Sequence, residues 1–221
     1  MRRAILVAAV IVSVALLVPT GAPARLLPPG VEPMQLSYRL WSVQWTKMAL
    51  ERDPRSPTSL FAVRGGQCGL AFGKAWLLPV SLGGMISTRC RIPAGKLLIV
   101  PVAGTGSVGG PQGPNREEDL RRRARRSLRD LGDVRLTVDG RSMRPGYVAW
   151  TPLFIVDLPP HNLFGPPSAA NPPGLANVVA VNYLAILSPL PRGRHVVTTS
   201  GTFRTPDGPR TDAMTFQLRV G

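Results

Sequence analysis

The side chains that could carry out acid–base chemistry are few in this sequence. His161 and His195 are the only histidines, and Asp157 lies four residues before the first of them. A histidine beside a carboxylate can serve as a general base, and two histidines with a carboxylate can hold a metal ion. Their spacing matches no metal-ligand pattern, and no Gly-x-Ser-x-Gly turn supplies an activated serine. A secreted hydrolase using Asp157, His161 and His195 is therefore the alternative hypothesis, and we expect these residues to be structural or solvated.

A glycosidase would need two acidic side chains at a fixed separation. The aspartates that could form such a pair are Asp133, Asp139, Asp157, Asp207 and Asp212. Several of them lie where turns favour aspartate for backbone reasons, so no pair is singled out.

The run from Gly104 to Gly109 matches the Gly-x-Gly-x-x-Gly pattern and follows an apolar segment. A dinucleotide site would require the third glycine to open a helix whose N-terminus holds the pyrophosphate. Instead, Gly and Pro continue through Pro114. We therefore interpret 104–114 as a flexible connector and expect no nucleotide cofactor.

Six arginines fall within nine residues of one segment. They are Arg121, Arg122, Arg123, Arg125, Arg126 and Arg129. Such a density could bind anionic cell-wall polymers or lipid headgroups. No aromatic residue interleaves with these arginines, so half of a nucleic-acid stacking surface is missing. The alternative is a solvated helix face that covers a sheet through Leu120, Ala124, Leu128 and Leu131.

The N-terminal residues 1–24 have the three parts of a secretory signal peptide. Arg2 and Arg3 give a positive start, Ile5 to Val18 is almost continuously apolar, and Ala22-Pro23-Ala24 forms a small-x-small cleavage site. An uncleaved anchor is the alternative, but the apolar run is shorter than the roughly 20 residues that cross a bilayer. We predict cleavage near Ala24 and a protein of the extracytoplasmic space or cell envelope.

The remaining 197 residues are enough for one domain with its own core. They keep 25 of the 27 basic residues and all 12 acidic ones, which leaves a formal net charge of +13. The basic residues comprise 24 arginines and three lysines, so part of this charge reflects composition. The only two cysteines, Cys68 and Cys90, are expected to form a disulfide in an oxidising compartment.

Two helices are predicted. After a Pro-rich, mobile lead-in at 25–35, residues 36–51 place Trp41, Trp45 and Met48 on one face, with Ser37 as a possible N-cap. Such a stripe belongs to a core more often than to a sugar-stacking platform. Residues 115–131 form the second helix, with Asn115 as N-cap, an acidic first turn and Gly132 as its stop.

The rest of the chain has the pattern of short strands. Apolar runs at 60–63, 76–80 and 96–102 are separated by Gly and Pro, and strands follow at 134–138, 147–150, 153–158, 194–199 and 214–220. Asp139-Gly140 predicts a tight turn, 159–174 a long loop and 177–187 an apolar strand. The fold class is therefore mainly β: an antiparallel β-sandwich over 36–221 with two peripheral α-helices.

Several blocks of the sequence resemble a group of uncharacterised exported proteins of high-GC bacteria. The most specific block is Arg89-Cys90-Arg91-Ile92-Pro93-Ala94-Gly95-Lys96, and Gln67-Cys68, Trp76–Leu78, Val138-Asp139-Gly140 and Leu190–His195 accompany it. The last of these is similar to turns before late strands of bacterial immunoglobulin-like domains. The resemblance implies compartment and a C-terminal immunoglobulin-like sandwich, and it implies no activity.

The sequence thus predicts an exported, non-catalytic binding or envelope-associated module, with the hydrolase as alternative. A third hypothesis is a subunit whose partner covers the apolar stretch 177–187.

Overall fold

The computed structural model describes residues 23–62, 66–110, 115–164 and 173–221. Its helices are α1 (Tyr38–Leu50) and α2 (Glu117–Arg129), with a short 3-10 turn at Pro33–Gln35. The signal peptide predicted at 1–24 lies almost wholly outside the described residues. Within them, neither helix is long and apolar enough to cross a membrane.

Strands fall into two large sheets and one small pair. The six-stranded sheet has the order β10-β11-β6-β3-β2, with β9 also paired to β11; the five-stranded sheet has the order β5-β13-β12-β7-β8. The strands are β1 (Phe61–Ala62), β2 (Leu70–Phe72), β3 (Ala75–Leu77), β4 (Val80–Ser81), β5 (Met85–Ile92), β6 (Leu97–Val108), β7 (Leu131–Val138), β8 (Arg141–Met143), β9 (Tyr147–Trp150), β10 (Phe154–Leu158), β11 (Gly174–Leu187), β12 (Gly193–Thr205) and β13 (Gly208–Val220). The β-sandwich prediction is confirmed, with most pairs antiparallel and β1–β4, β3–β6 and β5–β13 parallel.

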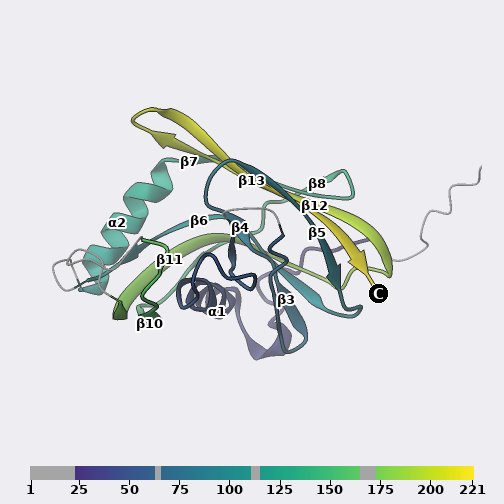
Figure 1. Cartoon of the computed structure of the whole chain (residues 1–221), viewed down its shortest axis with the longest axis horizontal. Coiled ribbons are helices and arrows are strands. Elements are labelled where there is room, and N and C mark those ends of the chain that lie inside the picture. The colour runs from purple at the N-terminus through teal and green to yellow at the C-terminus, as the bar shows by residue number, and fades with distance from the viewer. Residues whose placement is uncertain (1–22, 63–65, 111–114, 165–172) are drawn as a thin grey trace, which may run out of the picture.

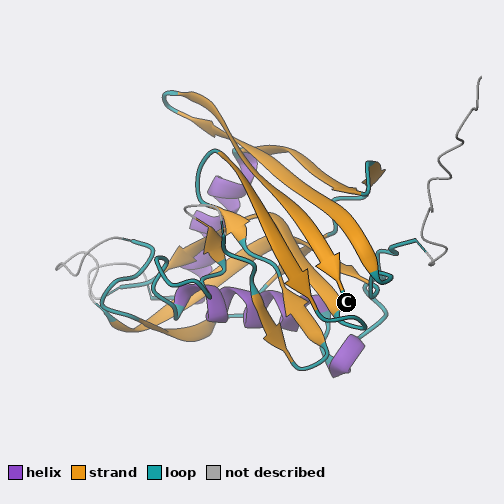
Figure 2. Ribbon diagram, turned by 45° about the vertical axis from the view of Figure 1, so that its right-hand side comes forward, coloured by secondary structure: helices purple, strands orange, loops and turns teal. Residues whose placement is uncertain are grey.

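The six-stranded sheet is the middle of three layers. In Figures 1 and 2, α1 lies along one of its faces and the five-stranded sheet crosses the other. Alternate residues of β11 enter different cores: Leu184 and Ile186 pack with α1, whereas Ala185 and Leu187 pack between the sheets. The apolar stretch 177–187 is therefore covered within the chain, which removes the reason for a partner that covers it.

Helix α1 is held by its apolar stripe, as the sequence predicted. Trp41 and Trp45 are buried, and their rings meet Phe72 and Phe61 edge to face at 5.7 Å. The Trp45 indole N–H donates a hydrogen bond to the Leu78 carbonyl at 2.9 Å. Ser37 is the N-cap, and its hydroxyl accepts from the backbone of the first turn. These two tryptophans are core residues and offer no exposed platform.

The Pro-rich lead-in is part of the fold at its start, in contrast to the mobile segment expected. Leu27 donates its backbone N–H to Ile186 at 2.8 Å, and Ser188 donates to Arg25 at 2.9 Å. The Tyr38 hydroxyl then donates to the Leu27 carbonyl at 2.5 Å. Burial raises the pKa of Tyr38 to about 12, so its phenol stays protonated and keeps donating this bond.

Helix α2 covers a part of the sheet that the five-stranded sheet leaves open. Leu120 and Ala124 are fully buried, and α2 packs on β6, β11 and the start of β7. Its boundaries differ from the prediction: Arg116, not Asn115, is the N-cap, and the Asn115 amide donates to the Gly110 carbonyl. Gly132 does not stop the helix but lies inside β7.

Several strand assignments also differ from those expected: β2 and β8 were not predicted, and the run at 76–80 is divided between β3 and β4. Strand β6 continues to Val108, so the start of the 104–114 connector is strand. Strand β5 was not recognised at all, because two arginines, a serine and a threonine interrupt its few apolar residues, of which Ile86, Cys90 and Ile92 face the core. Strands β12 and β13 form a hairpin that reaches to Thr205 and Gly208, well beyond the predicted 194–199 and 214–220.

The expected disulfide is present between Cys68 and Cys90, and the described residues contain no free cysteine. It ties the segment before β2 to β5, which otherwise belongs to the opposite sheet. A disulfide of this kind is typical of proteins that fold in an oxidising compartment.

Replacing both cysteines tests its contribution. We expect Cys68→Ala with Cys90→Ala to lower the free energy of unfolding by about 3 kcal/mol, because the unfolded chain loses a closed loop. Urea denaturation of both proteins measures this difference. An unchanged denaturation midpoint would show that the link adds no stability.

Candidate functional site

The structure separates the three residues of the hydrolase hypothesis. Asp157 is exposed on β10, at the edge of the six-stranded sheet, and the exposed His161 follows that strand. His195 lies on β12, a central strand of the other sheet. Within the described ranges, no three His, Cys, Asp or Glu side chains are grouped to hold a metal ion. The structure therefore assembles no hydrolytic constellation from these residues.

His195 is buried and fully engaged in hydrogen bonds. Its Nδ1 lies 2.8 Å from a carboxylate oxygen of Asp139, and its Nε2 lies 2.9 Å from the Pro191 carbonyl oxygen. Asp139 also accepts from the Val196 backbone at 2.8 Å and occupies the left-handed region, with φ of 51°, in the β7–β8 turn. The pair thus fixes the predicted Asp139-Gly140 turn against β12, and no ring nitrogen is left for chemistry.

All but the last residue of the Gly-x-Gly-x-x-Gly run lie on β6, so the run does not form a phosphate-binding loop. Gly104 and Gly106 are residues of β6, opposite Asn182 and Ala180 of β11. A Cβ at Gly104 would lie 2.1 Å from the Asn182 side-chain oxygen, so glycine is required for that side chain to fit. Asn182 in turn donates to Ser42 and Thr46 of α1, at 2.7 and 3.2 Å.

The six predicted polyanion-binding arginines divide into two sets. Arg121 pairs with Glu117 at 2.6 Å and donates to the Thr151 carbonyl at 2.9 Å, and Arg122 pairs with Asp119. The other four are exposed and form no ion pair with the part of the chain that the structure describes. They are Arg123, Arg125, Arg126 and Arg129. The helix therefore neutralises the arginines of its first turns and leaves the later ones open to solvent.

An aromatic ring lies beneath this helix, although none is present in its sequence. The guanidinium groups of Arg121 and Arg125 each lie 5.9 Å from the centre of the Trp150 ring, at the end of β9. The expectation that these arginines have no aromatic partner was therefore wrong for the folded chain. No local pattern could reveal it, because Trp150 lies 25 residues after Arg125 and is brought close by the pairing of β9 with β11.

A second basic cluster lies on the outer face of the five-stranded sheet. Arg219 of β13 is opposite Arg91 of β5 on one side and Arg194 of β12 on the other. All three are exposed, and none has an ion-pair partner in the described ranges. The sequence analysis missed this row because it depends on the register of three strands that are distant in the chain.

Compared with protein-family models, with curated proteins and with solved structures, the chain matches none.

The buried histidine is expected to act on stability. We predict that His195→Ala lowers the free energy of unfolding by about 1–3 kcal/mol, because Asp139 and Pro191 lose a buried partner. The matched control is His161→Ala, which removes the exposed histidine and is expected to change stability by less than about 0.5 kcal/mol. Equal effects in thermal and urea denaturation would contradict the structural role of His195.

The arginine row is expected to reduce stability. Like charges directly opposite on neighbouring strands repel, so Arg219→Thr should raise the free energy of unfolding by about 0.2–1 kcal/mol at low salt. Arg135→Thr is the control, because Arg135 is also exposed on a strand but lies opposite Ser200. Urea denaturation at low and high salt measures both, and a gain shared by the two variants would contradict the repulsion.

Proposed function

We propose that this chain is an exported, non-catalytic module of the cell envelope that binds an anionic polymer along the exposed face of α2. The N-terminal signal pattern and the resemblance to exported proteins support the compartment, as does the disulfide. A net charge of +13 after cleavage favours anionic partners in general. The arrangement of the arginines on α2 supports the particular surface.

The observation that carries the proposal is the cation–π contact of Arg125, whose guanidinium lies 5.9 Å from the centre of the Trp150 ring. The ring attracts the guanidinium through the face of its π-system and forms no hydrogen bond with it, so the N–H groups stay available to a phosphate or carboxylate. Arg125 has no competing carboxylate partner among the described residues, in contrast to Arg121 beside it. Arg126 and Arg129 continue the open surface toward the C-terminal end of the helix, so one strand of polymer could contact all three.

A polymer fits this surface better than a lipid bilayer does. A helix that lies in a membrane interface inserts an apolar face between the lipids. In α2 the apolar face is used against the sheet, because Leu120 and Ala124 are fully buried and the exposed positions all carry charged side chains. Such a helix can bind to a charged surface, but it has no exposed apolar side chain to insert into a bilayer.

The test compares two triple variants of the cleaved protein that remove equal charge. One is Arg125→Gln, Arg126→Gln and Arg129→Gln on α2; the other is Arg91→Gln, Arg194→Gln and Arg219→Gln on the five-stranded sheet. The probe is inorganic polyphosphate, measured by calorimetry across a salt series. We expect the α2 variant to bind about tenfold more weakly than wild type and the sheet variant to lose much less.

Equal losses in the two variants would mean that net charge alone attracts the polymer, and the proposal would be wrong. Phosphatidylglycerol vesicles are the second probe. If vesicles bound more tightly than polyphosphate and the α2 variant abolished that binding, the partner would be a lipid surface and not a polymer. Circular dichroism and denaturation of each variant confirm that the fold is kept.

A further inference from the structure

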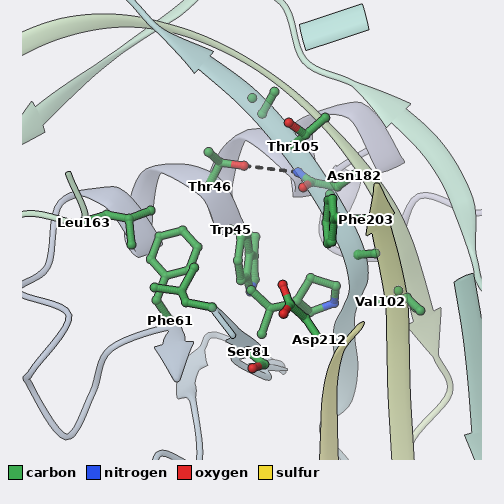
Figure 3. Close-up of a pocket in the computed structure, with 18 of the residues that line it drawn as sticks. Trp45, Thr46, Phe61, Ser81, Val102, Thr105, Leu163, Asn182, Phe203 and Asp212 are labelled. Carbon is green, nitrogen blue, oxygen red and sulfur yellow. Dashed lines mark hydrogen bonds between the residues drawn. The ribbon is translucent and has the colours of Figure 1, made fainter. Parts of the chain in front are cut away.

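A cavity of about 320 Å³ lies where α1 and both sheets come together. Trp45 and Leu50 of α1, Phe61 of β1 and the second half of β6 line one part of it, and β12 and β13 line the other. Most of the lining side chains are apolar (Figure 3). Phe164, which is exposed to solvent, also lines the cavity. A volume of this order is within the range of small-molecule sites.

Small residues on the paired strands β6 and β11 create this space. Gly104, Gly106 and Ala180 all line the cavity, and the two glycines are opposite Asn182 and Ala180 in the strand register. Strand β3 pairs with β6 only at Leu97–Ile99, so this edge of β6 is open from Pro101 onward and faces the cavity. Within the glycine run that resembles a phosphate loop in sequence, Gly106 thus leaves room for the cavity, whereas Gly104 leaves room for the Asn182 side chain.

One carboxylate points into this apolar space. Asp212 of β13 is more than nine-tenths buried, and one of its oxygens accepts from the Arg210 guanidinium at 3.1 Å. The other oxygen, Oδ1, is buried and accepts no hydrogen bond from the described part of the chain. Figure 3 shows the Asp212 side chain among the residues that line the cavity, beside Trp45. A buried carboxylate oxygen without a donor is costly, so the site favours a molecule that supplies one.

The neighbouring Arg210 donates a hydrogen bond to only one oxygen of that carboxylate. The Arg210 guanidinium lies 5.7 Å from the centre of the Phe203 ring, and its side chain is half exposed. It therefore approaches Asp212 from the solvent side, while Oδ1 stays on the buried side. Asp212 and Arg210 are the only charged residues among the described ones that line the cavity.

We propose that this cavity binds a small apolar molecule that carries an amine, with the ammonium group on Asp212 Oδ1 and the apolar part against Trp45, Phe61 and Val178. An ammonium is the best match, because it donates a charge-assisted hydrogen bond and also brings the opposite charge to a carboxylate in a buried, apolar site. An anionic headgroup would be repelled by the carboxylate. This site is separate from the exposed face of α2 and does not depend on the function proposed for that surface.

The test uses three probes with one tail and different headgroups: decylamine, decanol and decanoate. Calorimetry on the cleaved protein at neutral pH, below the micelle concentration of each probe, measures their affinities. We expect decylamine to bind about tenfold more tightly than decanol and decanoate to bind most weakly. This series uses the unaltered protein, so its outcome does not depend on how any variant folds.

Three variants then locate the binding. Asp212→Asn should weaken decylamine binding about tenfold and leave decanol nearly unchanged, since it removes the charge and keeps the shape. Asp207→Asn is the matched control, because Asp207 is exposed in the turn of the same hairpin, and it should change nothing. Ala180→Leu should abolish binding of all three probes by filling the cavity.

Decylamine binding no tighter than decanoate binding would overturn the proposal, as would decylamine binding that survives in a folded Ala180→Leu variant. The α2 triple variant should keep full decylamine affinity, so failure at the cavity and failure at the helix surface can be told apart.

Discussion

The architecture depends on β11, a strand that is apolar on both faces. A central strand buried on both sides needs a covering layer on each. Helix α1 covers the face of Leu184 and Ile186, and the five-stranded sheet covers Ala185 and Leu187. Farther along, Val179 and Val181 are fully buried but belong to neither core, and α2 packs against that part of the strand. The order of the layers and the need for a second helix both follow from this one strand.

Both candidate binding features lie in the half of the β6–β11 pair that β3 does not reach. There, one face receives α2 with its arginines, and the other face and the open edge of β6 border the cavity. Asn182 separates the two regions of β11: its amide is satisfied by Ser42 and Thr46, which fixes α1 at a set distance from the glycines. Space remains beyond that point because Gly106 and Ala180 have little or no side chain to fill it, whereas the place of a Gly104 side chain is taken by Asn182. The same part of the sheet is thus bonded to α1 at Asn182 and borders the cavity beside it.

Much of the fold could be predicted from local patterns. The stripe of Trp41 and Trp45 determined a core helix, the Asp139-Gly140 pair determined a tight turn, and the cysteines determined a disulfide, because each depends on a few neighbouring residues. The register between strands that are distant in the sequence could not be predicted from local patterns. For that reason the row of Arg91, Arg194 and Arg219, the approach of Trp150 to α2 and the placement of Asp212 among apolar side chains could not be foreseen. Asp212 was noted only as one of five interchangeable aspartates, since burial is decided by the hairpin and not by its neighbours in the chain.

The docking of the lead-in on β11 determines which way the molecule would face if it were tethered. Arg25 and Leu26 lie beside Ser188 and Leu187, and the C-terminal Gly221 pairs with Ile92 and Ala94, so both ends of the described chain lie at the end of the sandwich away from α2 (Figure 1). Along β11, Asn177 near α2 is ten residues from Leu187, a span of about 33 Å. A fusion partner, an affinity tag or a surface support joined at either terminus would therefore leave the arginine-bearing helix pointing outward and unobstructed.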